Sequence, residues 1–181
     1  MFKKLILATA LLTTTPLAMA SAAPYGGVST GITTTTGNHF SGFRGMPLNA
    51  FVGFGGIVSQ SFYLAGELTG TLATAEVTDS NALKTTYGYA LGILPGVMLS
   101  DHTLAFARVG VARARFSEVD ATRTGGQFGL GLQTSLTQNV DLRGEYDFTA
   151  YQSINRNVNG VNLTAAPRND AFTFGLIYKV D

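Results

Sequence analysis

The amino-acid sequence predicts an all-β protein: an eight-stranded antiparallel up-and-down transmembrane β-barrel, preceded by a signal peptide. Residues 127–151 alternate apolar and polar side chains in two runs joined by Thr137-Gln138-Asn139, which is typical of a hairpin. The polar side of these runs mixes glycines with Arg143, Glu145 and Asp147, and a membrane barrel needs an apolar outer face and a polar lumen. About 160 residues remain after the signal peptide, enough for eight strands of about 10 residues with their connections.

The first twenty residues have the pattern of a secretory signal peptide. Lys3 and Lys4 precede a short apolar stretch that ends in Ala18-Met19-Ala20. This stretch is shorter than the roughly 20 apolar residues of a membrane helix, which disfavours an N-terminal anchor. We therefore expect residues 1–20 to be removed, with cleavage two or three residues later as an alternative. Residues 21–181 are expected to form one outer-membrane β-barrel domain.

Composition and charge exclude several kinds of function. Removing Lys3 and Lys4 leaves 10 basic residues (12 minus 2) against 11 acidic ones, so nucleic acid is not an expected partner. The chain has no cysteine, which excludes disulfides, thiol nucleophiles and thiolate metal sites. No cofactor is expected. The 22 glycines disfavour helices and suit a small, tightly curved barrel.

Eight segments carry the alternation or fit between its breaks. We expect strands at residues 25–36, 49–58, 62–77, 84–99, 103–116, 127–136, 140–151 and 171–180. The register of the second strand stays open, because Phe54 and Ile57 have opposite parity. Pro95 cannot donate to a strand ladder, so a bulge is expected at Pro95-Gly96.

The predicted connections alternate in length along the chain. Those after the second, fourth and sixth strands are short, at residues 59–61, 100–102 and 137–139. The others are longer and polar, at residues 37–48, 78–83, 118–124 and 152–169. Short periplasmic turns and longer external loops are typical of outer-membrane barrels. We therefore expect localisation in the bacterial outer membrane, with the longer connections facing outward.

Three stretches resemble the OmpA/OmpX-type, opacity-protein-like outer-membrane barrels. They are PGVMLSDHTLAFARVGVARARF (95–116), QFGLGLQTSLTQNVDLRGEYDF (127–148) and FTFGLIYKV (172–180). The resemblance covers most of the mature chain and implies a barrel domain alone, without the peptidoglycan-binding domain of full-length OmpA-type proteins. It also implies that Leu94 stands where a lumen lysine is expected and Gln133 where a glutamate is expected.

Four charged residues match the lumen-facing charges of that family: Glu67, Arg108, Arg143 and Glu145. They could line a conducting path or plug the lumen. Eight-stranded barrels have interiors just wide enough for side chains to fill, and paired charges satisfy one another there. We favour the plug.

Aromatic and basic residues suggest contacts with the membrane. An aromatic girdle at the lipid interface explains Tyr87, Tyr89, Tyr146, Phe148, Phe172 and Tyr178 better than ligand stacking does. Lipopolysaccharide phosphates could be held by Arg113, Arg115 and Arg123, and the alternative for these arginines is a solvated strand end. Outer-membrane lipids and lipopolysaccharide are therefore expected partners, and the barrel is expected to be monomeric.

The function expected from these features is not enzymatic. His39 precedes Ser41 in a predicted loop without a third catalytic member, and His102 lies in a predicted turn. We expect an integral outer-membrane protein whose surface loops act in adhesion, as a surface antigen or in envelope structure, with a host or surface ligand for the loops. The alternatives are a narrow passive porin and a lipid-A-modifying barrel enzyme. A secreted lipocalin-like binder is disfavoured by the charges on the small-residue face.

Overall fold

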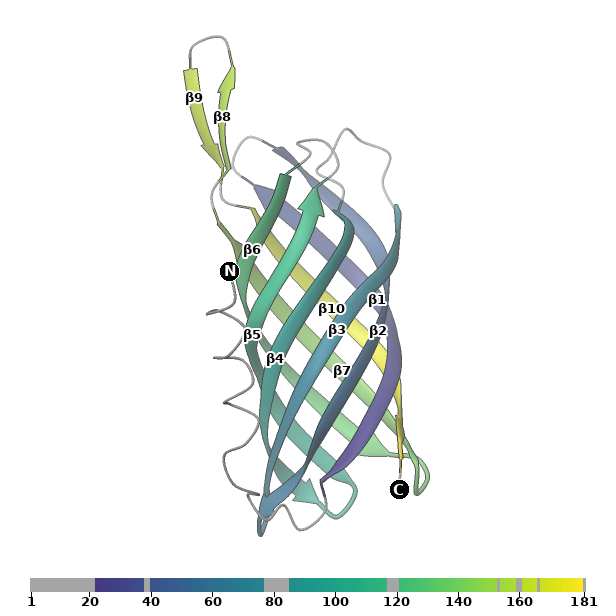
Figure 1. Cartoon of the computed structure of the whole chain (residues 1–181). Coiled ribbons are helices and arrows are strands. Elements are labelled where there is room, and N and C mark those ends of the chain that lie inside the picture. The colour runs from purple at the N-terminus through teal and green to yellow at the C-terminus, as the bar shows by residue number, and fades with distance from the viewer. Residues whose placement is uncertain are drawn as a thin grey trace, which may run out of the picture.

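The fold is a closed barrel of eight antiparallel strands, which confirms the predicted fold class (Figure 1). This computed structural model describes residues 22–37, 40–76, 85–116, 121–152, 154–158, 161–165 and 167–180. The barrel strands are β1 (Ala23–Gly37), β2 (Phe40–Ser59), β3 (Phe62–Glu76), β4 (Thr85–Ser100), β5 (Thr103–Phe116), β6 (Ala121–Ser135), β7 (Val140–Tyr151) and β10 (Arg168–Lys179). Around the barrel the strands follow the order β1, β2, β3, β4, β5, β6, β7 and β10. Each pairs with the next, and β10 pairs with β1 to close the barrel. The expected signal peptide lies outside the described residues.

A second, two-stranded sheet interrupts the connection between β7 and β10. It consists of β8 (Ile154–Val158) and β9 (Val161–Ala165), which pair only with each other (Figure 1). It stands at the end of the barrel where β3 and β5 end and β4 and β6 begin, which we call the loop end (Figure 1). The opposite end carries the short turns at residues 60–61, 101–102 and 136–139, and we call it the turn end. These three turns lie where the sequence predicts them.

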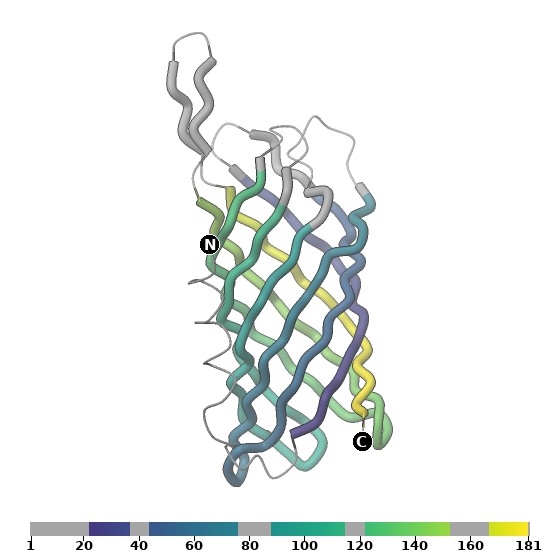
Figure 2. The backbone as a smooth tube through the Cα atoms, viewed as in Figure 1, coloured from purple at the N-terminus to yellow at the C-terminus, as the bar shows by residue number. Residues whose placement is uncertain are grey.

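The strands extend further toward the loop end than the sequence predicts. Residues 37–48 were expected to form a loop, but β2 begins at Phe40 and its hairpin with β1 is paired as far as Gly37 and Phe40. In the same way β6 begins at Ala121 and β10 at Arg168. Beyond the apolar zone neither face of a strand needs oily side chains, so the alternation ends while the backbone pairing continues. Figure 2 shows the backbones of the barrel strands running obliquely between the two ends. Residues 77–84, which include the predicted loop at 78–83, lie outside the described part.

Pairing with neighbours settles the register of β2 and the status of Pro95. Phe54 faces outward and is 56% exposed, whereas Phe51 is 5% exposed in the lumen and Ile57 lines a cavity on the same side. Apolar residues therefore occupy both faces of β2, with Phe54 outside and Phe51 and Ile57 in the lumen.

The predicted bulge at Pro95-Gly96 is wrong. The pairing of β4 with β3 runs through Pro95 without a shift, and its register with β5 is unchanged on either side.

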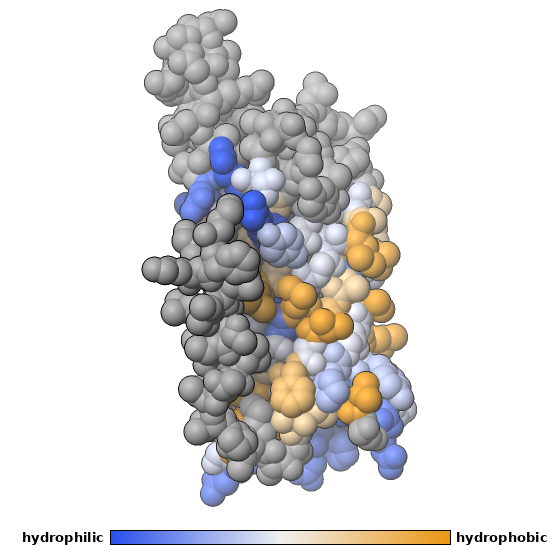
Figure 3. All heavy atoms as spheres, viewed as in Figure 1, coloured by the Kyte–Doolittle hydropathy of each residue, from blue (hydrophilic) through white to orange (hydrophobic). Residues whose placement is uncertain are grey.

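Apolar side chains cover the outside of the barrel. The outward positions of β4 and β6 show the pattern clearly, with Leu91, Ile93, Phe128, Leu130 and Leu132 each more than half exposed. Figure 3 shows hydrophobic side chains over the middle of the visible face and hydrophilic ones at its lower end. No helix in the described ranges is long and apolar enough to cross a membrane. The strands thus present a broad apolar surface, and the polar residues turn inward.

Three lumen aromatics lie over glycines of the adjacent strand. The directly paired residues are Tyr25 with Gly53, Phe51 with Gly27, and Phe106 with Gly131. A Cβ atom on any of these glycines would lie 2.3–2.4 Å from an atom of the facing ring. Each glycine therefore leaves the space that a flat-lying ring occupies across the strand pair.

Alanine at Gly131 is expected to lower the free energy of unfolding by about 1–3 kcal/mol, because its Cβ would displace the Phe106 ring within a filled lumen. The matched control is Gly66→Ala, since Gly66 faces outward and its Cβ would meet nothing within 4 Å. The control should change stability by less than about 0.5 kcal/mol. Urea unfolding in lipid vesicles measures both variants, and equal effects would contradict this account of the glycines.

Candidate functional site: the barrel lumen

The middle of the lumen holds a network of charged side chains from three strands. Glu67 on β3, Arg108 on β5, and Arg143 and Glu145 on β7 are all buried, with no more than 6% exposed. Arg108 donates from Nη2 to Glu67 and from Nε to Glu145. Arg143 Nη1 donates to Glu67 Oε2 at 2.6 Å. The structure thus brings together the four charges that the sequence analysis placed in the lumen.

Glu67 is the centre of this network. Its two oxygens accept from different guanidinium groups, and Oε2 also accepts from the Tyr25 hydroxyl at 2.9 Å. Arg143 is in turn held by Gln133 Oε1, which accepts from its Nε at 3.2 Å and its Nη2 at 2.9 Å. A buried charge is costly unless it is paired and hydrogen-bonded, and Glu67 and Arg143 satisfy that condition.

Arg143 also lies among three aromatic rings. Its Cζ atom is 5.0 Å from the ring centres of Phe51 and Phe106 and 5.7 Å from that of Tyr25. At these distances the negative faces of the rings attract the guanidinium. Because the same rings rest on the three glycines described above, the packing of the wall fixes the position of this cation.

Apolar side chains fill the lumen on the turn side of the charges. This layer consists of Ala65, Leu94, Leu104, Phe106 and Ile177, with Tyr63 and Met98 packed against it. Below it, Lys179 Nζ lies 2.9 Å from Asp141 Oδ1, beside a cavity of about 330 Å³ at the turn end. Leu94 is fully buried, so the position matched to a lumen lysine contributes to an apolar layer here.

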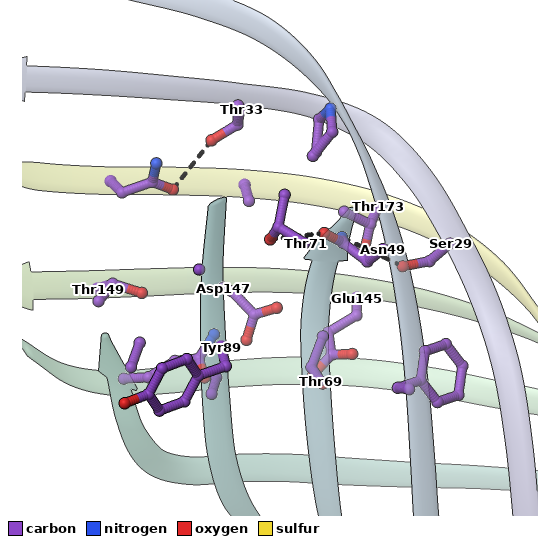
Figure 4. Close-up of a pocket in the computed structure, with 18 of the residues that line it drawn as sticks. Ser29, Thr33, Asn49, Thr69, Thr71, Tyr89, Glu145, Asp147, Thr149 and Thr173 are labelled. Atoms are coloured by element: carbon purple, nitrogen blue, oxygen red, sulfur yellow. Dashed lines mark hydrogen bonds between the residues drawn. The ribbon is translucent and has the colours of Figure 1, made fainter. Parts of the chain in front are cut away.

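A second cavity, of about 130 Å³, lies on the loop side of the charges (Figure 4). Hydroxyl and amide side chains contribute much of its wall, and they include Ser29, Asn49, Thr69, Thr71, Thr149 and Thr173. Several of them bond across strands, as in Thr71 to Asn49 at 3.0 Å and Asn49 to Ser29 at 3.4 Å. The carboxylates of Glu145 and Asp147 lie at its inner side. From the loop end to the turn end, the lumen therefore has a polar part, a charged middle and an apolar part.

The aromatic residues singled out from the sequence lie on the outer face wherever their side chains are described. Tyr89, Tyr146, Phe148 and Phe172 lie toward the loop end, and Phe172 pairs across strands with Tyr146. Tyr178 lies toward the turn end and is 58% exposed. The Tyr87 side chain is outside the described part. This placement gives aromatic side chains near both edges of the apolar surface, as an interfacial girdle requires.

The three arginines expected at lipopolysaccharide do not share one face. Arg113 is exposed on the outer face, where it donates to the Tyr89 hydroxyl at 3.3 Å. Arg123 pairs across strands with Ala114, which is buried in the lumen, so Arg123 faces inward, and its contact with lipopolysaccharide stays a prediction. The Arg115 side chain lies outside the described residues. Of these three arginines, Arg113 is therefore the one whose side chain the structure describes on the outer face.

The aromatic residues around Arg143 were not anticipated from the sequence. A signal for one of them exists, because Phe106 precedes Arg108 by two residues and must share its face of β5. The sequence contains no comparable signal for Phe51 and Tyr25, because each is recognised only by its pairing with a glycine in the adjacent strand. The contact between Lys179 and Asp141 joins strands β10 and β7 and was also missed.

The comparisons with known proteins agree with this architecture. A lumen lined by polar side chains inside an apolar closed wall defines a transmembrane β-barrel. The family model "Outer membrane protein beta-barrel domain" matches residues 5–179, so the chain belongs to this family and resides in the bacterial outer membrane. No curated protein matches the sequence.

Solved structures share the fold at low sequence identity. Neisserial surface protein A is 16% identical with a TM-score of 0.58, over 88% of this chain and 99% of that one. Ail, the attachment invasion locus protein of Yersinia pestis, is 12% identical with a TM-score of 0.53, over 88% and 97%. OprG from Pseudomonas aeruginosa is 10% identical with a TM-score of 0.51, over 87% and 96%. These similarities establish the eight-stranded fold.

Proposed function

We propose that this protein is a non-conducting outer-membrane barrel that acts by binding, through the segments at its loop end, in adhesion or as a surface antigen. The observation that carries the proposal is the filled lumen. The Arg143–Glu67–Arg108 network and the apolar layer around Leu94 separate the cavity at the loop end from the cavity at the turn end.

A filled lumen leaves little for the barrel interior to transport. Polar solutes crossing it would have to separate Glu67 from two guanidinium groups and displace the ring of Phe106. Breaking buried pairs of this kind costs several kcal/mol. The interior of an eight-stranded barrel is in any case only wide enough for its own side chains. These considerations favour a structural lumen over the narrow passive pore.

The binding function would rest on segments at the loop end. The β8–β9 sheet lies there, and rigid scaffolds commonly position functional loops in this way (Figure 1). Two proteins of the same fold carry names that refer to such roles, a surface protein and an attachment invasion locus protein. A structure of Ail contains the heparin analogue sucrose octasulfate, which makes sulfated polysaccharide a reasonable first probe.

Catalysis is not part of the proposal. His102 is exposed in the turn between β4 and β5, and its backbone N–H is 3.4 Å from the Ser100 hydroxyl. This position is at the opposite end of the barrel from the predicted loop that holds His39, and His39 itself lies outside the described residues. A histidine–serine arrangement for lipid-A modification therefore has no support from the placement of His102.

Planar-bilayer recording is expected to show no steady conductance for the wild-type barrel. The Phe106→Ala variant should admit ions at a measurable rate, because it removes one ring from the layer between the two cavities. Leu130→Ala is the matched control, since Leu130 faces lipid and its loss leaves the lumen unchanged. A steady wild-type conductance that Phe106→Ala does not alter would favour the passive-pore alternative.

Deleting the β8–β9 sheet tests the binding role. Cells that display the protein should adhere to epithelial cells or matrix glycoproteins, and replacement of residues 154–165 by a Gly-Ser linker should reduce that adhesion. The control carries the same linker within residues 136–139, which the proposal places in the periplasm. External protease should cut the loop end of intact cells and leave the turn end intact. Equal adhesion of the two variants, or cleavage at residues 136–139, would contradict the proposal.

A further inference from the structure

The cavity of about 330 Å³ at the turn end, which we call the turn-end cavity, contains a buried carboxylate that its neighbours do not fully satisfy. Asp141 on β7 is 3% exposed, and its Oδ2 accepts from Gln133 Nε2 at 2.6 Å. Its Oδ1 forms an ion pair with Lys179 Nζ at 2.9 Å but is buried without a hydrogen bond. A further donor at Asp141 Oδ1 would therefore stabilise this carboxylate.

Lys179 compensates the charge of Asp141 only in part. The Lys179 side chain is 33% exposed, and its ammonium group is also 3.5 Å from Ser135 Oγ. Among the described residues that border the cavity, the carboxylates are Asp101 and Asp141, Lys179 is the ammonium, and His102 is neutral at pH 7. One positive charge minus two negative ones leaves one net negative charge. Because Asp101 is exposed to water, a second cation would gain most beside the buried Asp141.

The first strand of the barrel begins at this cavity. Figure 1 shows the start of β1, in purple, at the turn end, and Ala23 borders the cavity. Ala23 has the parity of Tyr25, which faces the lumen and is 7% exposed. The expected cleavage after Ala20 makes Ser21 the first residue of the mature chain and gives it a free ammonium group. Two residues of extended chain span about 7 Å, so this group lies within reach of the cavity from Ala23.

We propose that the turn-end cavity binds the N-terminal ammonium group of the mature chain, with Asp141 Oδ1 as its acceptor. The inference rests on the expected signal cleavage and is independent of the adhesive role. The ammonium group would balance the net negative charge and supply the missing donor. It has three N–H groups, so one can donate to Asp141 while the others contact water. The volume of the cavity has room for the small side chains of Ser21 and Ala22.

This contact would connect two strands that are not neighbours in the wall. β1 carries the ammonium and β7 carries Asp141, and β10 lies between them. Removal of residues 1–20 would create the charge that makes the connection, because an uncleaved chain has a neutral peptide group at the same place. Signal cleavage would thereby complete the charge pairing at the turn end.

Competitive acetylation of the N-terminal amine tests the site. The barrel is isolated from outer membranes, its first residue is identified by mass spectrometry, and it is treated in lipid vesicles with limiting acetic anhydride at pH 7. The same reaction in urea gives the rate for the unfolded chain. An unpaired terminal amine has a pKa of about 8, and a carboxylate at hydrogen-bond distance raises that pKa by about one unit or more. The protonated form does not react, so acetylation of the folded chain should be about tenfold slower.

Two variants and one control show whether Asp141 is the partner. Asp141→Asn should restore the rate of the unfolded chain. Asp147→Asn is the matched control, because it makes the same change on the same strand beyond the apolar layer, and it should keep the tenfold protection. Insertion of Gly-Ser-Gly between Ala20 and Ser21 moves the amine about 10 Å further along the chain and should abolish protection with the lumen unchanged. Heat-modifiable migration on gels verifies that each variant is folded.

Equal acetylation rates for the folded and unfolded wild-type chain would overturn the proposal. Protection that survives in Asp141→Asn or in the insertion variant would do the same. So would an outer-membrane barrel that still carries residues 1–20. If Asp141→Asn does not fold, the insertion variant decides, since it leaves every residue of the barrel in place.

Discussion

Replacing Glu67 with alanine is expected to lower the free energy of unfolding of the barrel by about 3–5 kcal/mol, the range observed when one partner of a buried ion pair is removed. Glu67 is 1% exposed and accepts hydrogen bonds from Arg108, Arg143 and Tyr25. Its loss leaves two buried guanidinium groups short of an acceptor. Arg108 retains Glu145, but Arg143 retains only the neutral amide of Gln133.

Urea unfolding in lipid vesicles measures this effect. Asp170→Ala is the matched control, because it removes a carboxylate from the outer face, where Asp170 accepts from the Tyr146 hydroxyl and is not fully buried. The control should cost no more than about 1 kcal/mol. A Glu67→Ala barrel that loses less than the control would mean that the lumen is well hydrated and that the network is not a plug.

Arginine at Leu132 is the second change with a large expected effect. Leu132 is 56% exposed on β6, two residues after Leu130, which faces outward and is exposed to the same extent. Its arginine variant should lose about 2–4 kcal/mol in a bilayer, because the guanidinium is placed in hydrocarbon. Leu132→Ala should lose less, since it introduces no charge.

The comparison between vesicles and detergent separates the lipid effect from packing. In detergent micelles, which deform around a charge, the difference between Leu132→Arg and Leu132→Ala should shrink. If Leu132→Arg is silent in vesicles while Leu132→Ala behaves as a core cavity, the outer face of β6 does not contact lipid. That result would contradict the membrane-spanning barrel.

The parts of the fold that could be predicted are those where lipid contact imposes a pattern. On β6, residues 128–135 alternate because one face meets hydrocarbon and the other meets the lumen, and this stretch was assigned correctly. The paired strand ends beyond the membrane carry no such constraint. Residues 40–48 read as a loop because of their glycines and proline, yet they pair with β1. Their conformation depends on the partner strand rather than on their own composition.

The lumen residues illustrate the same limit. The inward direction of Arg143 and Glu145 follows from parity within one strand, whereas the contact of Arg143 with Glu67 joins positions 76 residues apart and requires the shear of the closed barrel. Arg123 was expected in the loop at 118–124, because β6 was expected to begin only at residue 127. Continuing the parity of Gln127 and Gly129 toward the N-terminus would have put Arg123 on the lumen side.

The pairing of β1 with β10 determines which step of folding is slow. All other paired strands of the barrel are consecutive in the order β1 to β7 and then β10. They can therefore form as successive hairpins with little loss of loop entropy. Tyr25 and Lys179 instead meet although 154 positions (179 minus 25) separate them along the sequence. Until they do, β1 and β10 are exposed sheet edges whose unpaired amides can add to another chain. Cross-linking these two strands through an engineered disulfide should therefore speed the final refolding phase and suppress aggregation, while a cross-link between β4 and β5 should do neither.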